Sequence, residues 1–340
     1  MQVYIHIGTE KTGTTSIQQF LGKNKLKLIQ HGVEPLGEFV VPGSLNNIAL
    51  PLAANENAGN DILAYRQDEF EKFREKVRSK LSEVILRNPH PQVKAIICSS
   101  EHLSSRLTTI DHTRALKSLF PAGCDFKIVI YLREQRDLLL SSQAESIKAG
   151  GSNISFNDPR KRIEPQPYGI IYYNFERMLG IWEAVFGEKN IIVRPYENAQ
   201  LLSGDVIPDF LSIIGVPSDV YAEDGAPVRL NKRLSPEVLF FLAKLNPHIN
   251  AKTRERIIQV LSTVDNFGKG EFSSNNLQTE FINQVSAYNV QVARKYLGRD
   301  WLFTDSKEPM RQFDISDTVK TQEIIFSLIG KLLDYETSRM

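Results

Sequence analysis

The sequence predicts an α/β fold, in which a parallel sheet is flanked by helices and followed by a helical C-terminal extension. Short apolar runs rich in β-branched residues alternate with amphipathic helical patterns over residues 1 to about 215, which is typical of a doubly wound parallel sheet. Helical patterns dominate the rest, and Ser235-Pro236-Glu237 is a typical helix start, with a Ser cap and Pro at the first position. We expect a single domain over residues 1–340, with a core at about 1–215 and a helical part at about 230–335.

The elements follow one another in a regular order. Strands are expected where apolar and β-branched residues form short runs, at residues 2–7, 93–99, 126–132 and 190–194. Helices are expected where apolar residues recur every three or four positions, at residues 14–30, 68–86, 111–120, 136–148, 172–186, 206–214, 279–297 and 319–333. The Gly-, Pro- and Asn-rich segments 32–60 and 150–167 are expected to be long connections beside a site.

Composition excludes several classes of function. Lys and Arg number 41 against 40 Asp and Glu, a net charge of +1, so no overall field attracts nucleic acid or a membrane surface. No run of about 18 apolar residues could span a membrane, and the apolar start is too short for a signal peptide. The two cysteines, Cys98 and Cys124, argue against a disulfide scaffold, and Cys98 falls in an expected buried strand. We expect a cytoplasmic protein without integral membrane association; the sequence does not predict its oligomeric state.

The segment from Tyr4 to Ser16 (YIHIGTEKTGTTS) predicts an apolar strand, a glycine-bearing loop and the start of a helix. Such an arrangement directs backbone N–H groups and a helix N-terminus toward one point, which favours a phosphate. Lys11 adds a cation there, and the hydroxyl groups of Thr14, Thr15 and Ser16 add donors. The segment therefore predicts a site for a phosphorylated ligand.

The lysine of this segment disfavours ATP or GTP as that ligand. A nucleotide-hydrolase loop has two glycines five residues apart and then a lysine. Gly8 and Gly13 have this spacing, but Thr14 follows Gly13 and the lysine, Lys11, precedes it.

Two segments resemble a known family. Lys-Thr-Gly-Thr-Thr-Ser at 11–16, after a strand that ends in His-Ile-Gly, resembles the 5′-phosphosulfate loop of the sulfotransferases that use 3′-phosphoadenosine 5′-phosphosulfate (PAPS), most closely in their bacterial branch. The expected strand 126–132 leads into Arg133, and Ser141 follows eight residues later, which resembles the 3′-phosphate motif of the same family. Ser142 is a near-equivalent candidate. An Arg guanidinium suits a phosphate monoester because it keeps its charge and donates several hydrogen bonds.

The resemblance implies a P-loop-like sulfotransferase fold and the corresponding reaction. A sulfuryl group passes from PAPS to a hydroxyl or amine of a glycan or small-molecule acceptor, adenosine 3′,5′-bisphosphate is released, and no metal is needed. Residues Thr12 to Ser16, Gly13 among them, are implied to hold the phosphosulfate, and Lys11 to stabilise the leaving group. Arg133 and Ser141 are implied to bind the 3′-phosphate.

Two further positions have weaker counterparts in the family. Tyr196 follows the expected strand 190–194 and could lie near the adenine, or else be a half-buried residue at a helix start. Lys269 and Gly270 resemble a reduced form of a late basic-glycine loop, but Gly268 stands where an Arg is usual. A plain glycine-rich turn is an equally open interpretation of these residues.

The catalytic base is expected just past the strand 93–99. Glu101 is the first choice and His102 the second, because the family can deliver its base from the end of this strand. The alternative role for Glu101 is to cap the helix that begins near Leu103. A third set comprises His31, Glu34 and Glu38, since some glycan sulfotransferases place a catalytic Glu after the first helix.

Three of these positions share a location that does not depend on the resemblance. Lys11, Glu101 and Arg133 all fall just past the carboxyl ends of expected strands, where parallel sheets bind their ligands. Two other functions stay open, namely a kinase that uses ATP and magnesium, and a nucleotide-binding protein that transfers nothing. His6 is expected to be a core residue beneath the loop.

Overall fold

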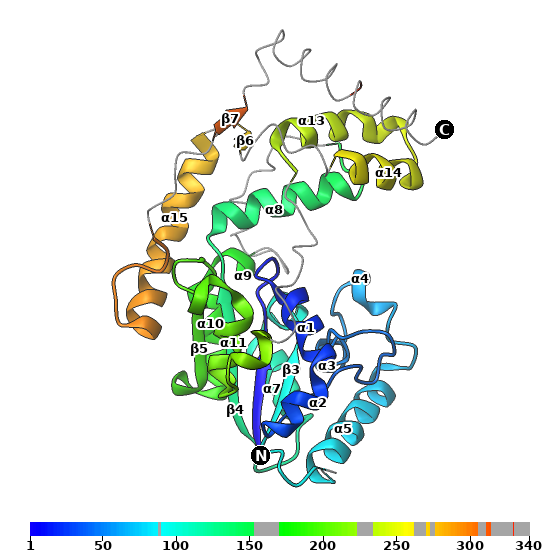
Figure 1. Ribbon diagram of the computed structural model, residues 1–340, viewed down its shortest axis with the longest axis vertical. Helices are drawn as coiled ribbons and strands as arrows, with labels where there is room; N and C mark the ends of the chain where they lie inside the picture. Colours follow the sequence, from blue (N-terminus) through cyan, green and yellow to red (C-terminus); the bar gives the residue numbers. More distant parts are fainter. Residues whose placement is uncertain are drawn as a thin grey trace. The chain divides into compact units, whose positions relative to one another are not determined.

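The computed structural model describes residues 1–87, 90–152, 170–222, 234–261, 270–272, 276–304, 311–313 and 329 (Figure 1). The chain divides into two compact units. The first unit comprises Met1–Glu134, Arg162–Pro227 and Val285–Phe303, and the second comprises Gln135–Lys161, Val228–Gln284 and Thr304–Met340. The segment Gln135–Lys161, which the sequence placed in the core region, thus belongs to the second unit.

A parallel sheet forms the centre of the first unit. Its strands in the described residues are β1 (Gln2–His6), β2 (Val33–Pro35), β3 (Ala95–Ser99), β4 (Asp125–Leu132) and β5 (Ile191–Pro195). They lie in the order β2-β3-β1-β4-β5, and each neighbouring pair is parallel. Because β1 lies between β3 and β4, the segments that follow these three strands meet at one edge of the sheet.

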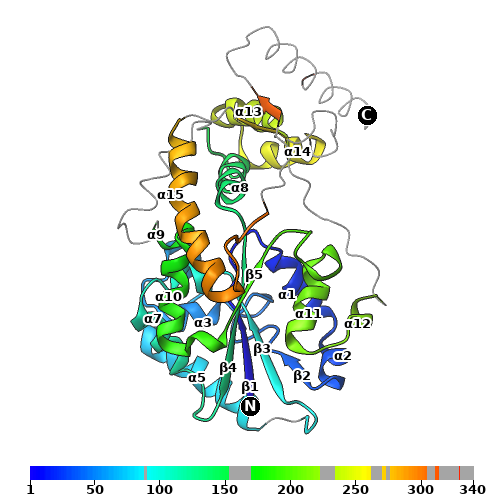
Figure 2. The ribbon, with the colours of Figure 1, turned by 90° about the vertical axis from the view of Figure 1, so that its left-hand side faces the viewer.

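Helices cover both faces of this sheet (Figure 2). One face carries α1 (Thr14–Lys23), α2 (Lys25–Gln30), α11 (Val206–Ile214) and α12 (Asp219–Ala222); the other carries α3 (Ala49–Ala54), α5 (Phe70–Leu86), α7 (Ile110–Lys117) and α10 (Phe175–Phe186). The short helices α4 (Asn60–Leu63), α6 (His102–Arg106) and α9 (Ile170–Tyr173) complete the helices of this unit up to α12. The α/β class and the parallel sheet expected from the sequence are therefore confirmed.

The apolar stripes of α1 and α11 build the core on their face of the sheet. Ile17 and Phe20 of α1 and Phe210 of α11 pack with Val129 of β4 in one buried cluster. Each such side chain stabilises the fold by about 1.5–3 kcal/mol when it is fully buried. This packing fixes the start of α1 against the centre of the sheet.

Three expected elements differ from the structure. The helix expected at 14–30 breaks at Asn24, whose side-chain amide and backbone N–H both donate to the carbonyl of Phe20. The helix expected at 172–186 breaks at Asn174, whose side chain caps α10 by accepting from Arg177 N–H. The connection expected at 32–60 contains strand β2 and the fully buried helix α3. The strand β2 and the helix α3 show no periodic pattern in the sequence because each is only a few residues long.

The described part of the second unit consists mainly of helices. Helices α8 (Gln135–Lys148), α13 (Pro236–Leu245) and α14 (Ala251–Leu261) share a core cluster that includes Ile147, Leu242 and Leu261. Asn246 joins them, since its side-chain amide donates to the carbonyls of Ile147 (2.8 Å) and Gly151 (2.7 Å). Ser235 caps α13 as expected, because its hydroxyl accepts from Val238 N–H.

The late part of the described chain contains a pair of short strands and a long helix. The short strands β6 (Gly270–Phe272) and β7 (Arg311–Phe313) pair in parallel in the second unit. Helix α15 (Asn276–Val292) continues into a π-helical turn over Ala293–Leu297. Phe303 then packs edge-on against Phe175, with ring centroids 6.5 Å apart.

Candidate functional site

The segments that follow β1 and β3 are hydrogen-bonded to the ends of neighbouring strands at the carboxyl edge of the sheet. The N–H of Thr9 donates to the carbonyl of Tyr131 (2.9 Å), and the N–H of Tyr131 donates to the carbonyl of Gly8 (2.7 Å). On the other side, the N–H of Ser100 donates to the carbonyl of His6 (3.0 Å). The glycine loop therefore begins in a position set by both neighbouring strands.

Two glycines let this loop, residues 8–13, pass close to its surroundings. Gly8 has φ +97°, and a Cβ atom there would lie 3.0 Å from the Cα atom of Glu101. Gly13 has φ +78°, and its Cβ would lie 3.0 Å from Cγ1 of Val206 and 3.2 Å from the hydroxyl of Tyr196. Both positions combine a left-handed backbone with a close approach, so a side chain is disfavoured at each. The loop is thus held against the start of α6 and the start of α11.

Helix α1 begins directly after Gly13, at the end of the central strand. The first N–H groups of any helix lack intrahelical acceptors and carry its positive dipole end. The N-cap residue of α1 is Gly13, which has no side chain to cap the helix, and the first turn contains no acidic residue. The side chains of Thr15 and Ser16 are exposed, whereas Thr14 is buried. The hydroxyl of Thr12 is used inside the loop, where it donates to the carbonyl of Thr9 (2.6 Å).

Two cationic residues lie at this helix start. Lys11 has a left-handed backbone (φ +64°) and an exposed side chain. The guanidinium of Arg133, which follows β4, donates from Nη1 to the backbone carbonyl of Lys11 (3.1 Å). The structure therefore brings together Lys11, Arg133 and the N-terminus of α1, which is a favourable combination for a phosphate or sulfate group.

The two candidate bases are held differently at the start of α6. Oε2 of Glu101 accepts from the side-chain amide of Gln18 in α1 (2.8 Å). No described side chain caps α6, so Glu101 does not play the capping role that was its alternative. His102 comes next, and its Nδ1 is buried without a hydrogen-bond partner in the described residues. Glu101 is therefore hydrogen-bonded to α1, the helix that follows the glycine loop.

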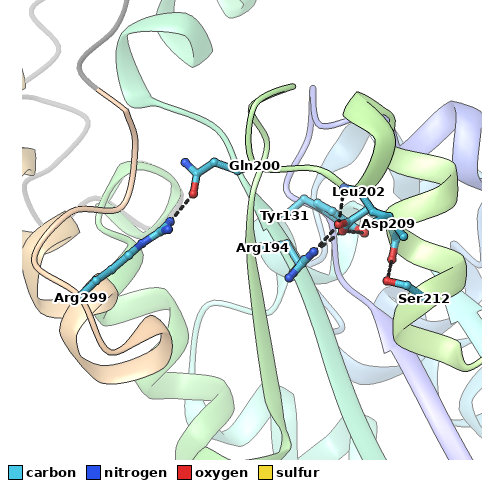
Figure 3. A network of polar contacts seen from close by, with 7 residues as sticks. All are labelled: Tyr131, Arg194, Gln200, Leu202, Asp209, Ser212 and Arg299. Atoms are coloured by element: carbon cyan, nitrogen blue, oxygen red, sulfur yellow. Dashed lines mark hydrogen bonds and ion pairs between the residues drawn. The ribbon is translucent and has the colours of Figure 1, made fainter.

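A buried carboxylate that the sequence did not single out accepts hydrogen bonds from residues of β4 and β5 near this edge of the sheet. Figure 3 shows Tyr131 and Arg194 converging on Asp209 of α11. The Tyr131 hydroxyl (2.8 Å) and Arg194 Nε (3.0 Å) donate to Oδ2 of Asp209, Arg194 Nη2 donates to Oδ1, and the N–H of Leu202 donates to Oδ1 (3.0 Å). The Asp209 side chain has no exposed surface. Its signal in the sequence is a single acid within the apolar run VIPDFLSII.

The Asp209 group, defined as Asp209, Tyr131 and Arg194, fixes the local electrostatics. Burial and the neighbouring Asp209 carboxylate raise the pKa of Tyr131, and the hydrogen bond to Asp209 raises that of Arg194. Tyr131 therefore stays neutral and Arg194 charged. Since the backbone of Tyr131 also bonds to Gly8 and Thr9, the group connects β4, β5 and α11 to the glycine loop.

His6 and Tyr196 complete the surroundings of the loop. His6 is fully buried beneath it, its Nδ1 is 2.8 Å from the hydroxyl of Ser99, and burial lowers its pKa to about 3. This confirms its expected place in the core. Tyr196 is half-buried, its N–H donates to the carbonyl of Leu132 (2.7 Å), and its hydroxyl lies beside Gly13.

Several expected site residues belong to the second unit or lie outside the described residues. Ser141 and the alternative Ser142 are half-buried on α8 in the second unit, whereas Arg133 belongs to the first. Gly270 opens strand β6 of the second unit, which differs from both the loop and the turn considered for it. Lys269 lies outside the described residues.

The third set of candidate bases has other partners. Glu34 is buried in β2 and its Oε1 pairs with Lys25 (3.2 Å). Glu38 accepts from Gly43 N–H (3.0 Å), and His31 is exposed at the end of α2. Glu34 thus pairs with a residue of α2, and Glu38 bonds within the segment between α2 and α3.

Two further findings concern metals and membranes. No group of three or more His, Cys, Asp or Glu side chains within the described ranges could hold a metal ion. None of the helices described combines the length and the apolarity needed to cross a membrane.

Comparisons with known proteins give little functional information. No protein-family model matches the chain. A protein of Archaeoglobus fulgidus, named only as uncharacterized, is 26% identical over 204 residues, which make up 58% of this chain and 53% of that relative. The chain thus spans about half the length of the relative that it matches. A functional conclusion depends on the geometry of the site.

Proposed function

We propose that the protein is a PAPS-dependent sulfotransferase with a P-loop-like fold, which transfers a sulfuryl group to a hydroxyl or amine acceptor. One observation carries the proposal. The start of α1, whose N-cap residue Gly13 has no side chain, follows the central strand and lies next to Lys11 and Arg133. The Glu101 carboxylate accepts a hydrogen bond from Gln18 of the same helix, and its Cα atom lies close to Gly8.

The residues of the loop fit a phosphosulfate. A Cβ atom at Gly13 would crowd Val206 and Tyr196, so glycine lets the loop pack closely against these residues just before α1 begins. The first turn of α1 offers N–H groups and two exposed hydroxyls, with no acid that would repel an anion. When bound, PAPS supplies the activated sulfuryl group.

The chain's own residues would divide the work of transfer among them. The first turn of α1 binds and orients the phosphosulfate, and Lys11 neutralises the charge that develops on the leaving phosphate oxygen. Arg133 binds the 3′-phosphate. Glu101 accepts the acceptor's proton while the new S–O or S–N bond forms and the bond from sulfur to the phosphate oxygen breaks.

The test measures release of adenosine 3′,5′-bisphosphate from PAPS in the presence of a mixture of glycosides and phenols. We expect turnover by the wild type without added metal. Lys11→Ala should lower kcat by roughly 100-fold or more, by analogy with the loss of one oxyanion donor, with a much smaller loss of affinity for the bisphosphate. Lys23→Ala, an exposed lysine at the far end of α1, is the control.

Three outcomes would contradict the proposal or part of it. Thermal stabilisation by ATP–Mg²⁺ but not by adenosine 3′,5′-bisphosphate would favour a kinase. Turnover that Lys11→Ala leaves unchanged would remove Lys11 from the mechanism, and binding of the bisphosphate without any turnover would favour a protein that binds the nucleotide only.

A further inference from the structure

The lysine of the glycine loop has a backbone conformation that its surroundings must hold in place. Lys11 has φ +64°, a left-handed conformation that is unfavourable for every residue with a side chain. Such positions persist only where their neighbours fix them, and they concentrate at functional sites. The Lys11 carbonyl accepts from Arg133 Nη1 (3.1 Å), and the hydroxyl of the buried Thr12 donates to the carbonyl of Thr9 (2.6 Å). These contacts fix the backbone at Lys11 and after it.

Glu10, which directly precedes Lys11, is bonded to a distant part of the chain. Its Oε2 accepts a hydrogen bond from the hydroxyl of Tyr172 (3.3 Å), a residue of α9 that lies 162 positions later. The backbone of Glu10 also lies near the first glycine of the loop, because a Cβ atom at Gly8 would be 3.3 Å from the Glu10 nitrogen. The bond to Tyr172 therefore connects the loop to α9 at the position next to Lys11.

Tyr172 belongs to packed structure, whereas Glu10 belongs to a loop. Helix α9 packs against α6 and α10. The ring of Tyr172 meets the ring of Tyr173 edge-on, with centroids 5.1 Å apart, and Tyr173 is only 1% exposed. The next residue, Asn174, caps α10. Tyr172 is therefore the fixed side of this contact, and the loop is the side that it holds.

The hydroxyl of Tyr172 keeps its proton and acts as the donor. Burial, followed by the charge of Glu10, raises the pKa of Tyr172 well above its usual value. Arg106 of α6, which pairs with Asp61 (2.6 Å), lowers this pKa, but its effect is outweighed. The neutral phenol thus donates to the carboxylate. A hydrogen bond to a charged acceptor is stronger than one between neutral groups.

We propose that Tyr172 is a positioning residue, which acts through Glu10 to hold Lys11 in place for sulfuryl transfer. The inference rests on the proposed function, because it concerns the role of Lys11 there. In that reaction the acceptor atom bonds to sulfur and its proton passes to Glu101. The electron pair of the broken S–O bond leaves on the phosphate oxygen, where the Lys11 ammonium neutralises it. A displaced Lys11 would lower kcat with little loss of affinity for the nucleotide.

The contact is tested first without any sulfuryl donor, by native-state proteolysis with endoproteinase Lys-C. Cleavage after Lys11 requires the loop to open, so its rate reports the population of the open loop. The full-length wild type is compared with Tyr172→Phe by mass spectrometry of the peptides, and cleavage after the exposed Lys189 is the reference within each digest. Tyr296→Phe is the matched control, because Tyr296 also donates to a carboxylate of a distant segment (Glu183, 2.6 Å).

We expect Tyr172→Phe to speed cleavage after Lys11 by about fivefold or more, because a hydrogen bond to a charged group is lost. Cleavage after Lys189 in this variant, and after Lys11 in Tyr296→Phe, should stay within about twofold of the wild type, as for independent sites. Glu10→Ala should act like Tyr172→Phe, whereas Glu10→Gln, which keeps an acceptor oxygen, should stay closer to the wild type.

The second test measures kcat for PAPS turnover, with calorimetry of adenosine 3′,5′-bisphosphate on the same samples. Tyr172→Phe should lower kcat by about tenfold and leave affinity for the bisphosphate within about threefold. In the Lys11→Ala background, the same change should lower kcat by less than about twofold, because the side chain that it positions is gone. A merely structural role would lower kcat equally in both backgrounds.

The outcomes separate this inference from the proposed function. Cleavage after Lys11 that Tyr172→Phe leaves unchanged, or a parallel rise after Lys189, would overturn the contact whatever the activity of the protein. Faster cleavage after Lys11 with an unchanged kcat, or equal losses of kcat in both backgrounds, would overturn the positioning role. Faster cleavage after Lys11 in Tyr172→Phe, in a protein that neither binds the bisphosphate nor turns over PAPS, would support the contact and contradict the sulfotransferase.

Discussion

Replacing Gly13 with alanine should lower the free energy of unfolding by more than backbone strain alone would. Gly13 has φ +78°, and its new Cβ would meet Cγ1 of Val206 at 3.0 Å and the Tyr196 hydroxyl at 3.2 Å. A left-handed backbone costs an alanine roughly 1–2 kcal/mol, and forcing an extra methyl into a packed place costs about 1–3 kcal/mol more. We therefore expect the free energy of unfolding to fall by about 2–5 kcal/mol and affinity for adenosine 3′,5′-bisphosphate to fall with it.

Gly215→Ala is the matched control for this change. Gly215 ends α11 with φ +73°, and no heavy atom of the described residues lies within 4 Å of the Cβ position. It should therefore lose only about 1–2 kcal/mol, the backbone cost, and keep its affinity for the bisphosphate. The assay is urea unfolding followed by tryptophan fluorescence, with calorimetric titration of the bisphosphate.

A double-mutant cycle with Val206→Ala tests the contact itself. Removing Cγ1 of Val206 should recover part of the loss caused by Gly13→Ala, with a coupling of about 0.5–3 kcal/mol, as for other residues in contact. Equal losses in Gly13→Ala and Gly215→Ala, together with strict additivity in the cycle, would refute the argument that close packing of the loop requires this glycine.

Three more predictions concern groups around the loop. Asp209→Ala should lower the free energy of unfolding by about 3–5 kcal/mol, because it leaves the Arg194 guanidinium without its buried partner; urea unfolding measures this, and a loss below about 1 kcal/mol would contradict the role of the pair. Burial lowers the pKa of His6 from 6.5 to about 3, so the unfolded state binds more protons than the folded state between these pH values. The free energy of unfolding should therefore fall by roughly 1.4 kcal/mol per pH unit as the pH drops from 6.5 toward 3. The difference in stability between wild type and His6→Gln should shrink with this slope, and parallel pH profiles of the two proteins would refute the prediction. Gln18→Leu should lower kcat for PAPS turnover by about tenfold with little change in bisphosphate affinity, because it frees the Glu101 carboxylate from its 2.8 Å hydrogen bond; an unchanged kcat, or a loss confined to affinity, would show that Gln18 does not position a base.

The first unit was largely predictable because its main strands and helices repeat strong local patterns. The strands β1, β3, β4 and β5 are apolar runs, and the strand ends that carry Lys11, Glu101 and Arg133 meet because β1 lies between β3 and β4. Parallel pairing then places the following loops at one edge. The sequence therefore sufficed to predict which segments form this edge.

Short elements and long-range contacts could not be predicted in this way. β2 has three residues and α3 has six, too few for a period to show, and the break at Asn24 depends on a local bond to the carbonyl of Phe20. The Asp209 group joins Tyr131 to a residue 78 positions later, and the Arg106–Asp61 pair spans 45 positions. Such partners are determined by packing, and a single sequence gives only the hint of a lone acid in an apolar helix.

The contacts of individual side chains could likewise be predicted only in part. The Glu101 side chain was found to be hydrogen-bonded to Gln18, and the Thr12 hydroxyl to be used within the loop. Ser141 and Gly270 belong to the second unit, which the periodicity of α8 and of the late glycine segment could not indicate.

Calorimetric titration of adenosine 3′,5′-bisphosphate into the metal-free protein tests the central claim most directly. We expect saturable one-site binding in the presence of EDTA, weakened by about tenfold or more in Arg133→Ala, since that variant loses a charge-assisted contact to phosphate. Absence of binding under these conditions, or binding of ATP only when magnesium is added, would contradict the account.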